Sequence, residues 1–386
     1  MSPWLSLLFW IVSGLLLAGS GLCLWHLRWA HRLPALEPPR GGEGVRAAPF
    51  VSVVLAARDE AARIERTLLR LLAQREAGIE VIVVDDRSTD GTGEILERMA
   101  LQDPRIRPLH VASLPEDWLG KCHACHIGAA AAGGEWILFT DADCWLAEDA
   151  LARALRVAEQ VGVDHVTLTP GVVPATPSAA AWHLAYLLTV IDWISAVNRD
   201  QPRAHFGIGA FNLVRRDAYD ACGGYESLRL TVVDDVKLGL LLRRAGFRTR
   251  GFIGGGDAEC HWGTTLRDMV RIMEKNYFAA VDYRLGVVLA SFLSGTLAGS
   301  LGIAGPFTGS LAGCAAAGGL LSFIAPAAVI ARRLRWSIWP ALLVPFVFFV
   351  LFYAVLNSAL VTIRQGGIRW RDTFYPLDLL RRGNVR

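Results

Sequence analysis

The sequence predicts a membrane-attached α/β protein, in which a doubly wound, mostly parallel sheet is flanked by N-terminal and C-terminal transmembrane helices. Between residues 50 and 140, apolar strand-like segments alternate with segments of helical periodicity, an order that builds a parallel sheet with helices on both faces. Apolar residues make up 53% of the 386-residue chain and gather near its two ends. The mean hydropathy of +0.36 therefore exceeds that of ordinary soluble proteins.

The N-terminal segment 4–27 carries no Asp, Glu, Lys or Arg and is long enough to cross a bilayer. It lacks the basic start of a secretory signal peptide and is longer than the apolar part of one, so we expect a retained anchor over residues 1–30. Basic residues follow it at Arg28, His31 and Arg32. By the positive-inside rule, the chain after the anchor is expected on the cytoplasmic face of a bacterial-type cell membrane.

A linker rich in proline and glycine is expected over 31–49, followed by a soluble domain over 50–260. Within that domain, apolar runs predict strands, and apolar residues at helical spacing predict helices. The expected strands are 50–57, 81–84, 106–111 and 135–140, and the expected helices are 61–75, 91–100 and 121–132.

Segment 178–197 is also strongly apolar. A membrane crossing there would place Asp143 and Asp234 on opposite faces of the membrane. It would also put His183 and Asp192 into lipid, which is costly. We therefore expect a buried or membrane-surface helix.

The part of the chain after residue 260 divides into three pieces. Residues 261–285 contain an amphipathic segment that fits either an interfacial helix or a helix facing the protein core. Residues 286–363 predict about three transmembrane helices, and 364–386 form a basic tail. The expected spans are 286–304, 308–330 and 338–363. Three crossings would leave the arginines of the tail outside, which conflicts with the positive-inside rule.

Charge and cysteine content bear on other classes of protein. The net charge of +3 gives no indication of nucleic-acid binding. The seven cysteines are odd in number and irregular in spacing in a domain expected in the cytoplasm, so we expect free thiols. Cys122 and Cys125, with His123 and His126, resemble half of a zinc site, but no second pair accompanies them.

Two acidic clusters are the most informative feature of the chain. Asp85-Asp86 and Asp141-Ala142-Asp143 each end an apolar strand. The carboxyl ends of parallel strands meet at one edge of a sheet, where open α/β sheets bind ligands. Carboxylates at that edge suit Mg²⁺ or Mn²⁺ together with a phosphate-bearing ligand. Capping of the following helix is the alternative for either cluster alone.

Three further groups occur in the same region. Arg58-Asp59-Glu60 follows the first strand, Lys121 precedes a helix, and Asp234-Asp235 begins another helix. Each has a simpler reading by itself: Lys121 as a surface residue, and the aspartate pair as a helix N-terminus favoured by the dipole. The joint order of all five groups favours a single site.

These motifs resemble the family-2 glycosyltransferases of GT-A fold, a Rossmann-like arrangement, over about residues 50–280. The segments that carry the resemblance are 51–60, 83–92, 141–143 and 234–235. Segments 118–121, 207–212 and 274–276 fit a membrane-anchored branch that includes hopanoid-associated, carotenoid and ceramide glycosyltransferases.

The resemblance implies how a nucleotide-sugar donor would bind. Asp59 and Asp86 would hold the nucleobase and ribose, with Asp85 and Glu60 in the same donor group. A uridine diphosphate sugar is the donor that the family suggests. The resemblance further implies that the acidic triplet binds the Mg²⁺ or Mn²⁺ ion that neutralises the diphosphate.

Catalytic roles also follow from the resemblance. Asp141 and Asp143 are the implied metal ligands, and Lys121 adds positive charge near the diphosphate. Asp235 aligns with the general base that deprotonates an acceptor hydroxyl, and Asp234 is its acidic neighbour. Because paired carboxylates raise each other's pKa, one of the two can act as a base. The family implies inversion at the anomeric carbon.

One departure from the family bears on the product. Processive members carry Gln-Xaa-Xaa-Arg-Trp after the base, whereas here the nearest match, 365–370, is one residue too long and lies beyond the last apolar segment. We interpret that match as chance and expect transfer of one sugar to a membrane lipid hydroxyl. A polyprenyl-phosphate acceptor and a non-catalytic nucleotide-binding or scaffold protein are the alternatives. The sequence carries no signal for oligomeric state.

Overall fold

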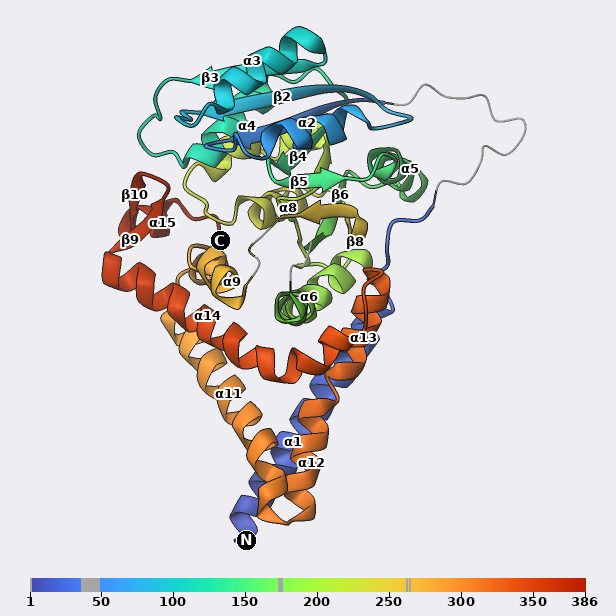
Figure 1. The fold of residues 1–386 in the computed structure, drawn as a ribbon, viewed down its shortest axis with the longest axis vertical. Helices are drawn as coiled ribbons and strands as arrows, with labels where there is room; N and C mark the ends of the chain where they lie inside the picture. Colours follow the sequence, from blue (N-terminus) through green and yellow to red (C-terminus); the bar gives the residue numbers. More distant parts are fainter. Residues whose placement is uncertain (1, 36–48, 173–175, 262, 264) are drawn as a thin grey trace, which may run out of the picture.

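The computed structural model describes residues 2–35, 49–172, 176–261, 263 and 265–386. Its central element is an eight-stranded sheet with the order β3-β2-β1-β4-β7-β6-β8-β5. Figure 1 shows the sheet and its helices at one end of the molecule, above a narrow bundle of long helices. The predicted α/β class, with apolar helices near both ends of the chain, is confirmed. Most of the expected linker, residues 36–48, lies outside the described residues.

One half of the sheet is parallel, as predicted. β1 pairs in parallel with both β2 and β4, and β2 pairs in parallel with β3. The strands are rich in Val, Ile and Leu and almost wholly buried at the centre, because helices cover both faces of a parallel sheet. The elements of this half are β1 (Phe50–Ala57), α2 (Ile64–Leu72), β2 (Gly78–Asp86), α3 (Thr92–Gln102), β3 (Ile106–Val111), α4 (Gly120–Ala131) and β4 (Trp136–Asp141).

The other half of the sheet is mixed. β7 runs antiparallel to β4 and β6, β6 runs parallel to β8, and β5 is an antiparallel edge strand on β8. Its strands are β5 (Cys144–Leu146), β6 (His165–Val172), β7 (Asn212–Arg215) and β8 (Thr249–Cys260). Its helices are α5 (Ala150–Val161), α7 (Arg216–Ala221), the short helix η1 (Gly224–Leu228) and α8 (Asp234–Arg244).

The apolar segment expected to be buried or at the membrane surface forms α6 (Pro177–Asn198). This helix packs against β8 and α14 (Val344–Gln365). Its side chain His183 is fully buried, and its Nε2 donates to the Pro170 carbonyl, 2.9 Å away. α6 therefore joins the sheet to the helices below it.

Five helices of the described residues are long and apolar enough to cross a membrane. Three segments form the narrow bundle in Figure 1: α1 (Pro3–Leu27), α11 (Leu285–Ala304), and α12 (Leu311–Leu321) continued by α13 (Ile324–Arg333). The hydroxyl of Ser13 on α1 donates to a carbonyl of α12. Most of the large side chains on α1 and α11 are exposed, as is expected where the neighbour is lipid.

α14 takes a different path from the bundle. It crosses beneath the sheet domain (Figure 1) and packs on α6, α9 (Leu266–Met273) and α10 (Asn276–Ala280). The buried hydroxyl of Ser358 donates to the carbonyl of Glu274 and accepts the N–H of Phe278. The third predicted C-terminal span is thus bonded to the domain along part of its length.

The last residues of the chain do not form the expected basic tail. They fold into β9 (Gly367–Trp370), β10 (Thr373–Pro376) and α15 (Leu377–Gly383), which pack back on the sheet domain. The Gly120 N–H donates to the Tyr375 hydroxyl, 3.3 Å away. Three crossings would have left this segment on the side opposite the domain, whereas the path of α14 returns it to the domain (Figure 1).

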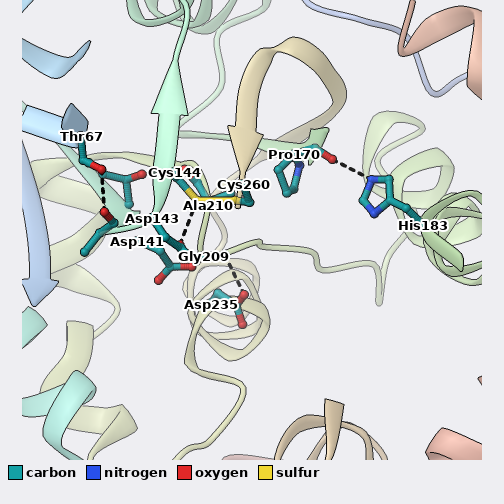
Figure 2. The surroundings of a disulfide bond; sticks show 12 residues. Thr67, Asp141, Asp143, Cys144, Pro170, His183, Gly209, Ala210, Asp235 and Cys260 are labelled. Carbon is teal, nitrogen blue, oxygen red and sulfur yellow. Dashed lines mark hydrogen bonds between the residues drawn. A yellow bond between two sulfur atoms is a disulfide. The ribbon is translucent and has the colours of Figure 1, made fainter. Parts of the chain in front are cut away.

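The expectation of seven free thiols is wrong for two of them. Cys144 and Cys260 lie directly opposite each other on β5 and β8, with their Cα atoms 4.4 Å apart, and form a disulfide (Figure 2). This Cα separation fits a disulfide without backbone movement. Spacing along the sequence did not indicate the pair, because 116 residues separate the two cysteines.

Candidate active site

A cavity of about 1130 Å³ lies between the carboxyl edge of the parallel strands and the helices below. Its walls come from the sheet domain and from α6, α9, α10, α14 and β9. Seven of the predicted site residues line it: Glu60, Asp86, Lys121, Asp141, Asp143, Asp234 and Asp235. The two others, Asp59 and Asp85, are not among the lining residues. The sheet thus brings together acidic groups that lie far apart along the chain.

Asp141 is held between the strand edge and a lysine. It is the last residue of β4, and the next carbonyl, that of Ala142, accepts a 2.6 Å hydrogen bond from the Thr67 hydroxyl. The Lys121 Nζ lies 2.8 Å from Asp141 Oδ1 and 3.7 Å from Asp234 Oδ2. Burial raises the pKa of Asp141, but the Lys121 ammonium outweighs burial and leaves that pKa below its usual value. Lys121 therefore lines the cavity between two carboxylates and is not a plain surface lysine.

Among the described residues, no lysine or arginine forms an ion pair with Asp143. Burial, helped by the charges of Asp141 and Glu60, raises its pKa to about 7. A carboxylate in this environment is stabilised by a cation. Asp141 and Asp143 present carboxylate oxygens from either side of Ala142, and oxygen ligands are those that Mg²⁺ and Mn²⁺ prefer. The residues at this position therefore fit a divalent metal.

The predicted acidic pair begins α8, as expected. The Tyr225 hydroxyl donates to Asp234 Oδ2 at 2.9 Å. The two oxygens of Asp235 accept backbone N–H groups, Oδ2 from Gly209 at 2.7 Å and Oδ1 from Val236 at 2.8 Å (Figure 2 shows the bond from Gly209). Burial, with the neighbouring charge of Asp234, raises the pKa of Asp235 to about 6. Asp235 is thus a carboxylate with the proton affinity of a usable base.

Asp86 marks the far end of the cavity. It is bonded to its neighbour Arg87, whose Nε lies 2.8 Å from Asp86 Oδ1, and Arg58 lies 3.8 Å away. Gly120 at the start of α4 is pressed against it, because a Cβ at that position would lie 2.2 Å from Asp86 Oδ2. A larger residue at 120 would displace this carboxylate.

Asp59 and Asp85 shape the loop beside Asp86. Asp59 Oδ1 accepts the Thr89 N–H at 2.9 Å, and Asp85 Oδ1 accepts the Ser88 N–H at 3.1 Å. The second oxygen of Asp85 faces His110, 3.1 Å from its Nδ1. The prediction that both aspartates contact the donor stays a prediction; in the structure each carboxylate accepts a backbone N–H of the 87–90 loop.

The segment 365–370, which sequence analysis sets aside as chance, lines the cavity. Trp370 faces Lys275, whose Nζ lies 3.4 Å from the centre of the indole ring. Burial, with the charge of Lys121, lowers the pKa of Lys275 to about 8. Arg371 forms an ion pair with Glu60 at 3.0 Å. The Arg369-Trp370 pair of this segment was visible in the sequence. Its place beside the cavity could not be predicted, because it depends on the path of α14.

His261, directly after the disulfide, also lines the cavity and stacks on Trp145 with ring centres 3.6 Å apart. Its N–H donates to the Asp143 carbonyl at 3.3 Å. The next residue, Trp262, lies outside the described residues. The disulfide thus stands between the acidic triplet and the segment that leads to α9.

A curled, mostly parallel sheet with carboxylate clusters at its carboxyl edge and a metal-compatible triplet defines the GT-A class of glycosyltransferase domain. Residues 52–223 match the model of glycosyl transferase family 2. The domain over these residues therefore resembles family 2, and the resemblance inferred from the sequence is confirmed.

Two bacterial relatives illustrate the match. A 4,4'-diaponeurosporenoate glycosyltransferase of Staphylococcus haemolyticus is 26% identical over 251 residues, which are 64% of this chain and 65% of the relative. A beta-monoglucosyldiacylglycerol synthase of a Nostoc species is 29% identical over 196 residues, which are 49% of this chain and 40% of the relative. The chain thus matches less than two thirds of the length of either relative.

One solved structure resembles nearly the whole molecule. A mannosyltransferase of Pyrobaculum calidifontis, PcManGT, which was solved in complex with GDP-Man and Mn²⁺, has a TM-score of 0.58 to this chain. The likeness covers 94% of this chain and 99% of that one, at 19% sequence identity. At this identity it supports the fold alone.

Proposed function

We propose that the protein transfers one sugar from a nucleotide-sugar donor to a hydroxyl group of a membrane lipid, with inversion and without processive elongation. One observation carries the proposal: a single cavity runs from the acidic edge of the sheet to the apolar helices below it. Tyr186, Val190 and Trp193 of α6 line the same cavity as Asp235 and the acidic triplet. A lipid headgroup and a nucleotide sugar can therefore meet at Asp235.

In the proposed mechanism, Asp235 takes the proton of the acceptor hydroxyl as that oxygen attacks the anomeric carbon. The raised pKa of Asp235 suits it to receive a proton near neutral pH. Lys121 and Lys275 stabilise the negative charge that develops on the leaving nucleotide diphosphate. A Mg²⁺ or Mn²⁺ ion held by Asp141 and Asp143 would supply Lewis-acid stabilisation to the same diphosphate.

The names of relatives support a lipid acceptor. One acts on a diaponeurosporenoate and the other makes a glucosyldiacylglycerol, so both names specify lipid-type acceptors. A uridine diphosphate sugar is the donor we propose, on the basis of the family resemblance. The solved structural neighbour holds a guanosine diphosphate sugar, so donor screening must include both bases.

We further propose that α1, α11 and the α12–α13 segment span the membrane, while α14 lies along its surface. Figure 1 shows the three spans meeting at an end of the molecule remote from the sheet, where the N-terminus lies, whereas the C-terminus lies beside the domain. The remote turn at 305–311 carries no charged residue. Arg28 and Arg32 follow α1, Arg284 precedes α11, and Arg332 and Arg333 end α13; Figure 1 shows these helix ends toward the sheet domain.

This topology removes the conflict found in the sequence. With two C-terminal spans, the arginines after α14 share the side of the domain, and the positive-inside rule places that side in the cytoplasm. A reporter at residue 386 is expected on the cytoplasmic face, and a reporter in the 305–311 turn on the opposite face. A C-terminal reporter outside the cell would contradict the arrangement.

The transfer itself is tested with full-length protein in lipid nanodiscs. Uridine and guanosine diphosphate sugars are supplied with Mn²⁺ and a membrane lipid extract, and the lipids are followed by mass spectrometry. The expected product is a lipid that gains one hexose in a metal-dependent manner, and Asp143→Ala abolishes it. Absence of metal-dependent nucleotide release across the donor panel would contradict the proposal. A product on polyprenyl phosphate that persists in Asp235→Asn would favour the phosphate acceptor instead.

A further inference from the structure

A chain of buried hydrogen bonds leads from β8 to the loop that contacts Asp235. The Thr249 hydroxyl lies 3.1 Å from His165 Nδ1, and His165 Nε2 lies 3.0 Å from Asn212 Oδ1. His165 and Asn212 are both 0% exposed. The three residues come from β8, β6 and β7, so the chain runs across the sheet and not along one strand.

The direction of every bond in this chain is determined. Asn212 Oδ1 also accepts the backbone N–H of Ile208, at 3.2 Å. A backbone N–H only donates, so the amide atom that faces it is the oxygen, and His165 Nε2 must carry the proton. His165 Nδ1 then accepts from the Thr249 hydroxyl. Burial lowers the pKa of His165 to about 4, which is consistent with this neutral form.

The chain of hydrogen bonds reaches Asp235 through Gly209, the residue that follows Ile208 in the loop. The Ile208 N–H is held by Asn212 and by the Thr167 hydroxyl, 3.1 Å away. Fixing this amide fixes the following one, and the N–H of Gly209 donates to Asp235 Oδ2 at 2.7 Å (Figure 2).

The loop formed by residues 207–209 is closely packed against its surroundings. A Cβ on Gly209 would lie 2.7 Å from Asp141 Oδ2, and a Cβ on Gly207 would lie 2.1 Å from the backbone oxygen of Asp235. The contact at 207 is with backbone, so this position requires glycine, whereas a side chain at 209 would displace the Asp141 carboxylate. The loop is therefore wedged between the metal-compatible carboxylate and the carboxylate of Asp235, and its position sets their separation.

The network carries a cost that stability alone does not explain. Asn212 Nδ2 is buried and has no hydrogen-bond partner among the described residues. A buried polar group without a partner is destabilising, whereas replacing both partners of a buried hydrogen bond by apolar groups of the same shape can be nearly neutral. The side-chain oxygen of Asn212 accepts hydrogen bonds from Ile208 and His165. The presence of asparagine here therefore indicates that the loop must be held in place.

We propose that His165 and Asn212 are positioning residues of the transfer reaction, which hold the Gly209 N–H on Asp235 and so orient the carboxylate that receives the acceptor proton. The inference rests on the proposed function, because it takes Asp235 as the base. The Val236 N–H fixes only one oxygen of Asp235. Without Gly209 the carboxylate can turn about its Cβ–Cγ bond, and misplacement of a catalytic group by about 1 Å can cost about a hundredfold in rate.

The test compares two substitutions of His165 in the full-length protein. His165→Leu removes both ring nitrogens, while His165→Gln retains an N–H that reaches toward Asn212. We expect His165→Leu to lower kcat about tenfold to a hundredfold with the donor KM within about twofold, because donor binding does not use Asp235. His165→Gln is expected to recover most of this loss.

His183 provides a matched control. It is also a fully buried histidine whose Nε2 donates to a backbone carbonyl, that of Pro170, and Figure 2 shows it beyond Pro170, away from Asp235. His183→Leu is expected to lower the melting temperature as His165→Leu does, but to leave kcat and KM within about twofold. Equal loss of kcat in both leucine variants, or failure of glutamine to restore it, would overturn the proposal.

A second readout separates this inference from the proposed function. Hydrogen–deuterium exchange of residues 205–213 is expected to be faster in His165→Leu than in His183→Leu, whether or not turnover is found. If the wild-type protein shows no transfer, the function proposed above fails, and the exchange result still decides the network. If His165→Leu does not fold, Thr249→Val removes the far end of the chain and should give the same effects at a few-fold size. Unchanged exchange and kcat in that variant would overturn the inference.

Discussion

The cavity has two walls that are built in different ways. The sheet edge, formed by Asp86, Asp141 and Asp143, consists of residues at or just after the ends of β2 and β4, the strands on either side of β1. The helical wall, formed by α6, α9, α10, α14 and β9, is assembled from segments up to about 190 positions apart. The sheet edge is therefore encoded in local sequence, whereas the helical wall depends on how distant helices pack. Substitutions in the two walls are expected to fail in different ways.

Asp235, where the two walls meet, is expected to give the largest effect. Asp235→Asn keeps the shape of the side chain but removes the base, so kcat should fall about 10²–10⁴-fold. Steady-state kinetics with a hydroxyl acceptor measure the loss. Asp220→Asn, an exposed aspartate on α7, is the control and should behave as the wild type. A loss under tenfold would show that the proton is taken elsewhere.

Asp143→Ala tests the sheet edge alone. Loss of one metal-compatible carboxylate removes several kcal/mol of charge stabilisation, and kcat/KM should fall about 10²–10³-fold. Donor binding measured by calorimetry should also lose its dependence on Mn²⁺, while the melting temperature stays near that of the wild type. Unaltered metal dependence would place the ion at other residues.

The disulfide joins β5, directly after the acidic triplet, to β8, and its removal should act on stability. Cys144→Ser with Cys260→Ser is expected to lower the free energy of unfolding by about 2–4 kcal/mol, because the bridge closes a long loop. Thermal unfolding with and without a dithiol reductant measures this. The single variant Cys222→Ser, at a free thiol, is the control. Equal melting temperatures for the double variant and the control would show that the bridge does not form.

The pH dependence of the transfer rate should report on the protonation of Asp235. Because burial and Asp234 raise the pKa of Asp235 to about 6 in the folded protein, the base becomes protonated as the pH falls through that value. The rate should be constant above the pKa and fall about tenfold per pH unit below it. The same profile in Asp235→Asn should lack this acid limb; an unchanged limb would assign it to another group.

Lys275 tests the helical wall and should give the smallest effect. Lys275→Met removes a charge that lies over Trp370 and faces the cavity, so kcat/KM for the donor should fall about tenfold, comparable to one charged hydrogen bond. Lys275→Arg keeps both the charge and the contact with the ring, and should retain most of the activity. If the arginine variant is as impaired as the methionine one, charge is not what the site requires.

The sequence predicted the parallel half of the sheet well. Strands 50–57, 106–111 and 135–140 agree with β1, β3 and β4 within a residue, because continuous apolar runs specify buried strands. The acidic groups at their ends followed directly. Asp59 follows β1 and Asp85 lies near the end of β2, as the sequence predicted. Which way each carboxylate points depends on side-chain packing that a motif does not specify.

The helical wall could not be predicted in the same way. Hydropathy cannot distinguish a helix that crosses lipid from α14, since both are long and apolar. The contribution of Trp370 and Arg371 follows only once α14 is known to run beneath the domain. The pairing of Cys144 with Cys260 and the His165–Asn212 network likewise depend on the order of strands across the sheet, which local patterns do not encode.

The return of β9 to the cavity has a consequence for biosynthesis. Trp370 follows Asp235 by about 135 positions, so at translation rates of about 5–20 residues per second it emerges on the order of ten seconds later. In the topology proposed above, α11, α12 and α13 insert into the bilayer during that interval. A nascent chain thus has its acidic sheet edge before it has a closed cavity, and insertion into the membrane becomes a step in the maturation of the enzyme.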